Sequence, residues 1–93
     1  MISHHATRSA RQNAWYWAVI LPTIGAALGA HPADLHEYCK LRFNPVQDAA
    51  GTFGGSTAAM DTAQFGAYCD AIRRWAWQTW QLDIPTPAYA SAA

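Results

Sequence analysis

The segment AWYWAVILPTIGAAL, residues 14–28, decides the fold because it carries no charged side chain and repeats its large apolar residues at helical spacing. Trp17, Leu21, Ile24 and Leu28 fall on one helical stripe. The residues between them are also mostly apolar. A helix that is apolar all round must be covered on every side. A short chain has few elements for this, so we expect contact with a second copy.

Helix signals on either side of this segment set its limits. Ser9 is a suitable N-cap, and Gly29 is a typical residue for ending a helix, so we predict a helix over 10–28. Pro22 has no backbone N–H and should distort the helix near 18–21. The stretch is shorter than the roughly 20 residues of a membrane span and lacks the start of a signal peptide. We therefore expect a cytoplasmic protein with no membrane partner.

Two further helices are predicted downstream. HPAD, residues 31–34, opens a helix that extends to about Arg42, with Pro in its first turn. Asp61 and Gln64 match a capping box that starts a helix running to about Leu82. Its predicted core residues are Phe65, Tyr68, Cys69, Ile72, Trp75, Ala76 and Thr79.

The intervening residues 44–57 are rich in turn formers and hold at most one short β-hairpin or turn. The predicted fold is therefore mostly α: a compact three-helix domain over 9–84. A flexible arm is expected over 1–8 and an extended tail over 85–93.

Composition excludes several classes of protein. Six Lys and Arg balance six Asp and Glu over 93 residues, so the chain lacks the basic excess of a bulk nucleic-acid binder. A hydrophobic content of 52% with five Trp excludes intrinsic disorder. Cys39 and Cys69 are too few for a secreted disulfide scaffold, so we expect two free thiols in a reducing cytosol.

Catalytic and metal-binding patterns are sparse. His31, His36 and Cys39 have spacing that could serve zinc, but a fourth ligand would have to come from Cys69 or from His4 or His5. The competing interpretation is a surface histidine beside a buried thiol. The sequence contains no recognisable nucleophile motif. We predict a protein that is not an enzyme and binds no metal or cofactor.

A binding surface is predicted on the third helix. At 100° per residue, Arg73, Arg74 and Trp77 lie away from the apolar stripe. Exposed Trp beside Arg suits stacked bases of single-stranded nucleic acid or a protein interface. Arg8 and Arg11 could extend this surface. Alternatively, Trp77 packs beneath the C-terminal Pro segment or in a homodimer interface.

Two segments resemble the NinB/Orf family of phage recombination proteins. RSARQNAWYWAVI, residues 8–20, is similar to an "RS-x-x-QN-x-x-x-W" helix start in that family. GGSTAAMDTAQFGAYCDAIRRWA, residues 54–76, is similar to its "G-x-ST-x-x-M" turn and following helix. The positions that match are Arg8, Gln12, Asn13, Trp17, Ser56, Thr57 and Phe65. The N-terminal strand region of better-known members is absent, and so is their more basic C-terminal sequence.

The resemblance implies a recombination mediator that binds single-stranded DNA and contacts the host single-strand binding protein. On that basis we expect a homodimer that binds DNA through Arg8, Arg11, Arg73, Arg74 and Trp77. The neutral composition favours a different function, a protein-interaction module such as a phage-encoded inhibitor of a host defence or replication complex. Gln12 and Asn13 are also expected to hydrogen-bond the Ser56–Thr57 turn.

Overall fold

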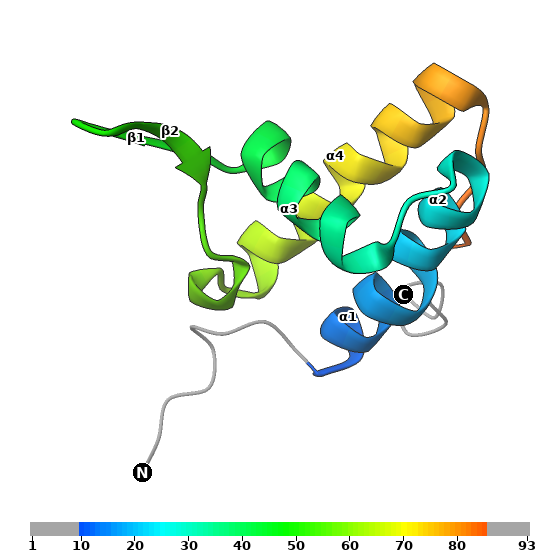
Figure 1. Ribbon diagram of the computed structural model, residues 1–93. Coiled ribbons are helices and arrows are strands. Elements are labelled where there is room, and N and C mark those ends of the chain that lie inside the picture. The colour runs from blue at the N-terminus through cyan, green and yellow to red at the C-terminus, as the bar shows by residue number, and fades with distance from the viewer. Residues whose placement is uncertain (1–9, 86–93) are drawn as a thin grey trace, which may run out of the picture.

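Three helical segments and one hairpin make up the computed structural model, which describes residues 10–85. The elements follow in the order α1 (Ala10–Trp15), η1 (Tyr16–Ile20), α2 (Leu21–Leu28), α3 (Pro32–Phe43), β1 (Pro45–Asp48), β2 (Gly51–Gly54), η2 (Thr57–Ala59) and α4 (Thr62–Trp80). Figure 1 shows α4 running across the fold, with α3 and the α1–η1–α2 segment packed against it and the hairpin projecting outward. The predicted mostly-α fold is confirmed. The arm predicted over 1–8, the Ser9 cap and tail residues 86–93 lie outside the described residues.

The first helical segment contains a π turn where a distortion was predicted. The N–H of Leu21 donates to the carbonyl oxygen of Tyr16, one residue further back than in an α-helix. This wider turn lies just before Pro22, whose ring would clash with the carbonyl of the preceding α-turn. The segment ends as predicted at Gly29, which has a left-handed φ of 69°.

The π turn changes which side chains face the core. Tyr16, Ile20, Leu21 and Ile24 are buried, whereas Trp17 is 39% exposed and Leu28 is also exposed. The predicted stripe through Trp17 and Leu28 was therefore wrong at both ends. At Trp17 the reason is that a uniform rotation of 100° per residue does not hold across a turn that contains an extra residue. Leu28 follows Leu21 and Ile24 in the regular α2, and it is exposed as the last residue of that helix.

Helix α3 begins at the predicted HPAD motif. The His31 side chain is the N-cap, and its Nδ1 accepts a hydrogen bond from the N–H of Ala33 over 3.1 Å. Pro32 occupies the first turn. A backbone N–H at that position has no acceptor within the helix, so its absence in Pro32 costs no helical hydrogen bond. Leu35 and Cys39 point into the core from this helix.

The hairpin pairs β1 with β2 in antiparallel register, with Val46 opposite Phe53. Asp48 Oδ1 accepts a hydrogen bond from the N–H of Ala50 in the turn. Gly54 lies so close to α3 that an added Cβ would come within 2.6 Å of the Lys40 Cβ. A side chain at position 54 would therefore push the hairpin off the helix.

Helix α4 has the predicted capping box. Asp61 Oδ1 accepts from the N–H of Gln64, and Gln64 Oε1 accepts from the N–H of Asp61. The helix ends at Trp80, where Gln81 takes up a left-handed conformation, slightly before the predicted end at Leu82. Thr79 was wrongly predicted as a core residue; it is exposed on the last turn of the helix.

The segment after α4 turns back along the first helix. Ile84 is buried in the common core. The indole N–H of Trp15 donates to the carbonyl oxygen of Pro85 over 2.9 Å, which fixes the chain against α1. The core thus draws on α1–η1–α2, α3, α4 and this returning segment.

No single helix within the described range 10–85 is long and apolar enough to cross a membrane. One pair of helices reaches the required length and hydropathy only when its members are taken together. The pair is Ala10–Leu28 and Pro32–Phe43, and the chain bends by 100° between them.

Candidate functional site

The exposed face at the end of α4 is formed around Trp77. This side chain is 55% exposed, the highest value among the large exposed hydrophobic residues described. Arg74 precedes it by one helical turn and is also exposed. Gln78 and Gln81 are exposed beside them. We call Arg74, Trp77, Gln78 and Gln81 the Trp77 face. The prediction that Trp77 lies outside the core is confirmed.

Arg73 belongs to a different environment from Arg74. Its guanidinium donates to the carbonyl oxygen of Ile84 over 3.3 Å and lies 5.8 Å from the centre of the Trp15 ring. Asp70 Oδ1 is 3.7 Å from its Nη1, so Arg73 is also the ion-pair partner of Asp70. Arg73 therefore holds the returning segment against α1 and α4.

Of the remaining predicted cations, Arg11 is described, and it does not join the Trp77 face. Arg8 lies outside the described residues. Arg11 is exposed on α1 next to Gln12, whose side-chain N–H donates to the carbonyl oxygen of Thr62 at the start of α4. Trp77 is fifteen residues beyond Thr62 along α4, and this separation is about 22 Å at 1.5 Å per residue. Arg11 and Trp77 are thus near opposite ends of that helix.

Residues that match the family motif join the first helix to the start of α4. The side-chain N–H of Gln12 donates to the carbonyl oxygen of Thr62 over 3.1 Å, and the expected bond of Gln12 to the Ser56–Thr57 turn stays a prediction. Ser56 Oγ accepts from the N–H of Ala58 and caps η2. Thr57 and Phe65 are buried. Gln12, Thr57 and Phe65 therefore have places in the packing of the fold; Asn13, on α1, is half-buried.

A second exposed surface is an aromatic cluster between α3 and α4 that sequence analysis missed. The Trp75 ring lies 5.6 Å from Tyr38, 5.5 Å from Phe43 and 4.8 Å from Trp80. The Arg42 guanidinium lies 5.3 Å from the Trp75 ring centre. Helical periodicity assigns residues to faces within one helix only. It therefore did not predict that Tyr38, Phe43 and Arg42 of α3 contact Trp75 of α4.

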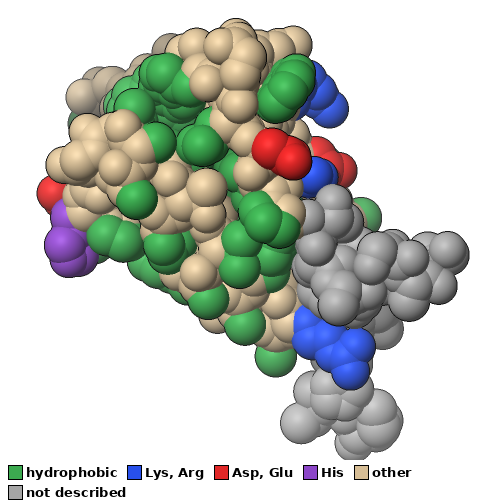
Figure 2. Space-filling model, turned by 90° about the vertical axis from the view of Figure 1, so that its right-hand side faces the viewer, with side chains coloured by type: hydrophobic (Ala, Val, Ile, Leu, Met, Phe, Trp, Pro, Cys, Tyr) green, Lys and Arg blue, Asp and Glu red, His purple; other side chains and the backbone are tan. Residues whose placement is uncertain are grey.

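Beside this cluster is a shallow apolar hollow of about 270 Å³. It is lined by Leu28, Ala30, Asp34, Leu35, Tyr38, Trp75 and Trp80. Asp34 carries the only charge among these side chains. Figure 2 shows the face that includes the ends of α2 and α4, with hydrophobic side chains spread across it. We call the hollow and the Trp75 cluster together the aromatic groove.

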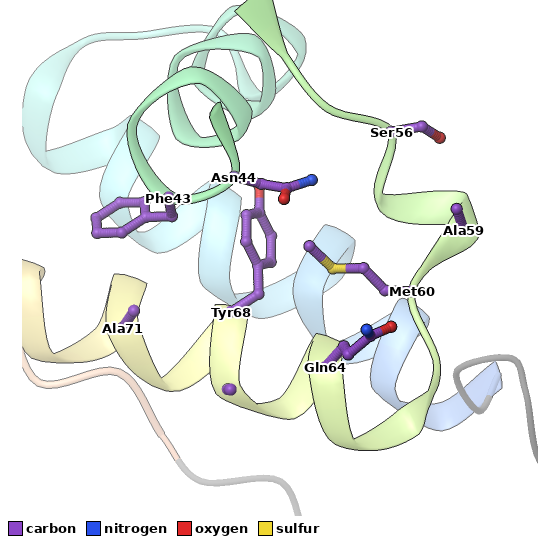
Figure 3. Close-up of a pocket in the computed structure, with 9 residues that line it drawn as sticks. Phe43, Asn44, Ser56, Ala59, Met60, Gln64, Tyr68 and Ala71 are labelled. Atoms are coloured by element: carbon purple, nitrogen blue, oxygen red, sulfur yellow. The ribbon is translucent and has the colours of Figure 1, made fainter. Parts of the chain in front are cut away.

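A larger depression of about 490 Å³ lies where α3, η2 and the first half of α4 meet. Figure 3 shows Phe43 at one side, Met60 and Gln64 at the other, and Tyr68 rising from α4 between them. Asn44, Gln64 and Ser56 supply its polar side chains. Among the described residues that line it, Tyr68 is the only one with an ionisable side chain.

A buried polar network lies beneath the surface between α3 and α4. Tyr16 Oη is 2.6 Å from His36 Nδ1 and 3.0 Å from Tyr68 Oη. Burial and the neighbouring Tyr68 hydroxyl raise the pKa of Tyr16 far above its ordinary value. The Trp17 ring covers His36 at 4.7 Å between ring centres. This network fixes the rings of the core in place.

Four of the residues considered for zinc lie in the described part of the chain, whereas His4 and His5 lie outside it. His31 caps α3, His36 contacts Tyr16, and Cys39 and Cys69 are buried and form no disulfide. Burial raises the pKa of Cys39 to about 12. Among residues 10–85, no group of three or more His, Cys, Asp or Glu is placed to hold a metal ion.

Comparisons with family models, with curated proteins and with solved structures found no match to this chain.

Proposed function

We propose that this protein is a non-catalytic accessory module that binds a partner protein through the Trp77 face. The observation that carries the proposal is the 55% exposure of Trp77 at the end of a helix whose other aromatic residues are all less exposed. Leaving an indole in water is unfavourable unless it is covered part of the time. Trp and Arg are also the residues most enriched among interface hot spots.

The charges around Trp77 favour a protein over a nucleic acid as the partner. Within residues 10–85, Arg74 is the only cation on the Trp77 face, because Arg73 is bonded to the Ile84 carbonyl and paired with Asp70. Affinity for nucleic acid comes largely from the number of phosphates that are neutralised. One Arg beside one ring supplies little of that affinity, whereas it is sufficient for a hot spot within a protein interface.

A photo-crosslinking residue introduced at position 77 tests the proposal inside bacterial host cells. We expect one discrete crosslinked protein band, identifiable by mass spectrometry, that survives nuclease treatment. The matched control carries the same crosslinker at Phe53, which is exposed on the hairpin away from α4. Crosslinking at position 53 but not at position 77 would contradict the proposal.

Single-stranded DNA is the second candidate ligand, consistent with the mediator function implied by the family resemblance. One observation favours it: Trp77 and Arg74 are both exposed one turn apart, which suits a base stacked on the ring and a phosphate at the guanidinium. A fluorescent oligonucleotide in low salt tests this candidate by anisotropy. Salt-sensitive binding that Trp77→Ala abolishes would support it, and absence of binding would exclude it.

A further inference from the structure

The exposed side of α3 carries opposite charges at its two ends with an apolar centre. Asp34, Tyr38 and Arg42 follow one another at intervals of four residues, so they form one row along the helix. Tyr38 is 47% exposed and its neighbour Leu41 is 46% exposed. Asp34 and Arg42 are exposed as well, and neither has an ion pair within residues 10–85.

This row is complementary to itself when reversed. Asp34 and Arg42 are equally distant in sequence from Tyr38, so a two-fold axis at Tyr38 places each Asp34 opposite Arg42 of the other copy. Two-fold interfaces in homodimers are self-complementary in this manner. Rows at intervals of four residues are also the ridges that pack in the commonest class of helix contact.

The aromatic groove gives the same arrangement an apolar interior. The hollow borders α3 at Asp34, Leu35 and Tyr38, and Trp75 and Trp80 form its opposite side. An antiparallel second α3 brings a second Tyr38 and Leu41 over this hollow. Glu37 and Lys40 are already paired with each other at 3.0 Å on the same helix. They therefore do not oppose the approach with an unpaired charge.

From this self-complementarity we propose that α3 and the aromatic groove form the interface of a two-fold homodimer, with two reciprocal Asp34–Arg42 ion pairs around a central pair of Tyr38 rings. The occupant of the groove is a second copy of this chain. Trp77 does not line the hollow, so the proposed interface does not use it. The proposal stands independently of what the Trp77 face binds.

Charge reversal tests the pairing directly, with the dimer dissociation constant measured by analytical ultracentrifugation. Asp34→Arg places two Arg side chains together at both ends, and Arg42→Asp does the same with two Asp. We expect either single variant to weaken the dimer by roughly ten-fold or more. The double variant Asp34→Arg with Arg42→Asp restores opposite charges and should recover most of the affinity.

Two controls separate this result from other effects. Circular dichroism should show unchanged helix content in all three variants, because both positions are exposed. Trp77→Ala should leave the dissociation constant of the dimer unchanged, since Trp77 lies outside the groove. A wild-type chain that stays monomeric at millimolar concentration would overturn the proposal. So would a dimer that neither single reversal weakens, or a double variant that is weaker than both singles.

Discussion

Tyr16 Oη lies 2.6 Å from His36 Nδ1, which joins the π turn of the first helix to α3 through a half-buried imidazole. The same hydroxyl lies 3.0 Å from Tyr68 Oη on α4. One phenol oxygen therefore connects all three helical segments. Its position depends on the wide turn at residues 16–20, which directs Tyr16 and not Trp17 into the core.

Removing this hydroxyl should destabilise the fold. Tyr16→Phe removes the hydrogen bonds of the Tyr16 hydroxyl with His36 and Tyr68, at a cost of about 1–3 kcal/mol in the free energy of unfolding. Urea denaturation followed by circular dichroism measures the change. Tyr38→Phe is the control, because the exposed Tyr38 should lose almost nothing. Equal stabilities for the two variants would show that the network does not contribute.

Alkaline pH should destabilise the protein through Cys39 and Tyr16. Burial raises the pKa of Cys39 from an ordinary 9.0 to about 12, and that of Tyr16 is raised in the same direction. The folded state therefore holds these protons more tightly than the unfolded chain does. Their contribution is fully present below pH 9 and is lost as the pH rises towards 12.

Urea midpoints measured at neutral pH and at pH values from about 9 upward test this dependence. We expect a constant midpoint up to about pH 9 and a fall above it. Cys39→Ala should have a shallower fall than the wild type, because the thiol no longer titrates. A wild-type midpoint that rises in the alkaline range would contradict the assignment.

The cap of α4 should matter more than other surface carboxylates. Asp61→Ala removes the acceptor for the N–H of Gln64, with an expected loss of about 0.5–2 kcal/mol in stability. Asp83→Ala, at an exposed position after the helix, should stay within about 0.5 kcal/mol of wild type. Thermal denaturation compares the two, and an Asp83 variant as unstable as the Asp61 variant would refute a specific capping effect.

Two glycines within helices should respond to alanine in opposite directions. A Cβ at Gly25 would meet the Ala30 carbonyl oxygen at 2.6 Å, so Gly25→Ala should lower stability by about 1–3 kcal/mol. A Cβ at Gly66 would have its nearest neighbour, Gln12 Nε2, at an ordinary 3.5 Å. Gly66→Ala should raise stability by about 0.5–1 kcal/mol. Chemical denaturation measures the stability of both variants. Changes in stability of the same sign for Gly25→Ala and Gly66→Ala would contradict this packing.

Local signals in the sequence predicted the ends of the helices well. The Asp61–Gln64 capping box, the left-handed Gly29 and the Pro32 start all act through bonds between residues a few positions apart. Sequence reasoning failed where one extra residue in a turn shifts the register. Trp17 was expected in the core, and the π turn places Tyr16 there instead. Leu28 was also expected in the core, and it is exposed as the last residue of α2.

The candidate site was predicted only where it depends on one helix. The outward position of Trp77 follows from the periodicity of α4 alone, and it is confirmed. The separation of Arg73 from Arg74 depends on the returning Ile84 segment, and the Trp75 cluster depends on how α3 crosses α4. Contacts between elements distant in sequence leave no periodic pattern to read.

The central claim is that the Trp77 face binds a partner protein, and quantitative capture from nuclease-treated host lysate tests it most directly. Tagged wild type, Trp77→Ala and Phe53→Ala are compared at equal amounts, and each captured protein is quantified by mass spectrometry. We predict a host protein that wild type and Phe53→Ala retain equally and that Trp77→Ala loses by at least ten-fold. Retention of every captured protein by Trp77→Ala at the wild-type level would contradict the claim.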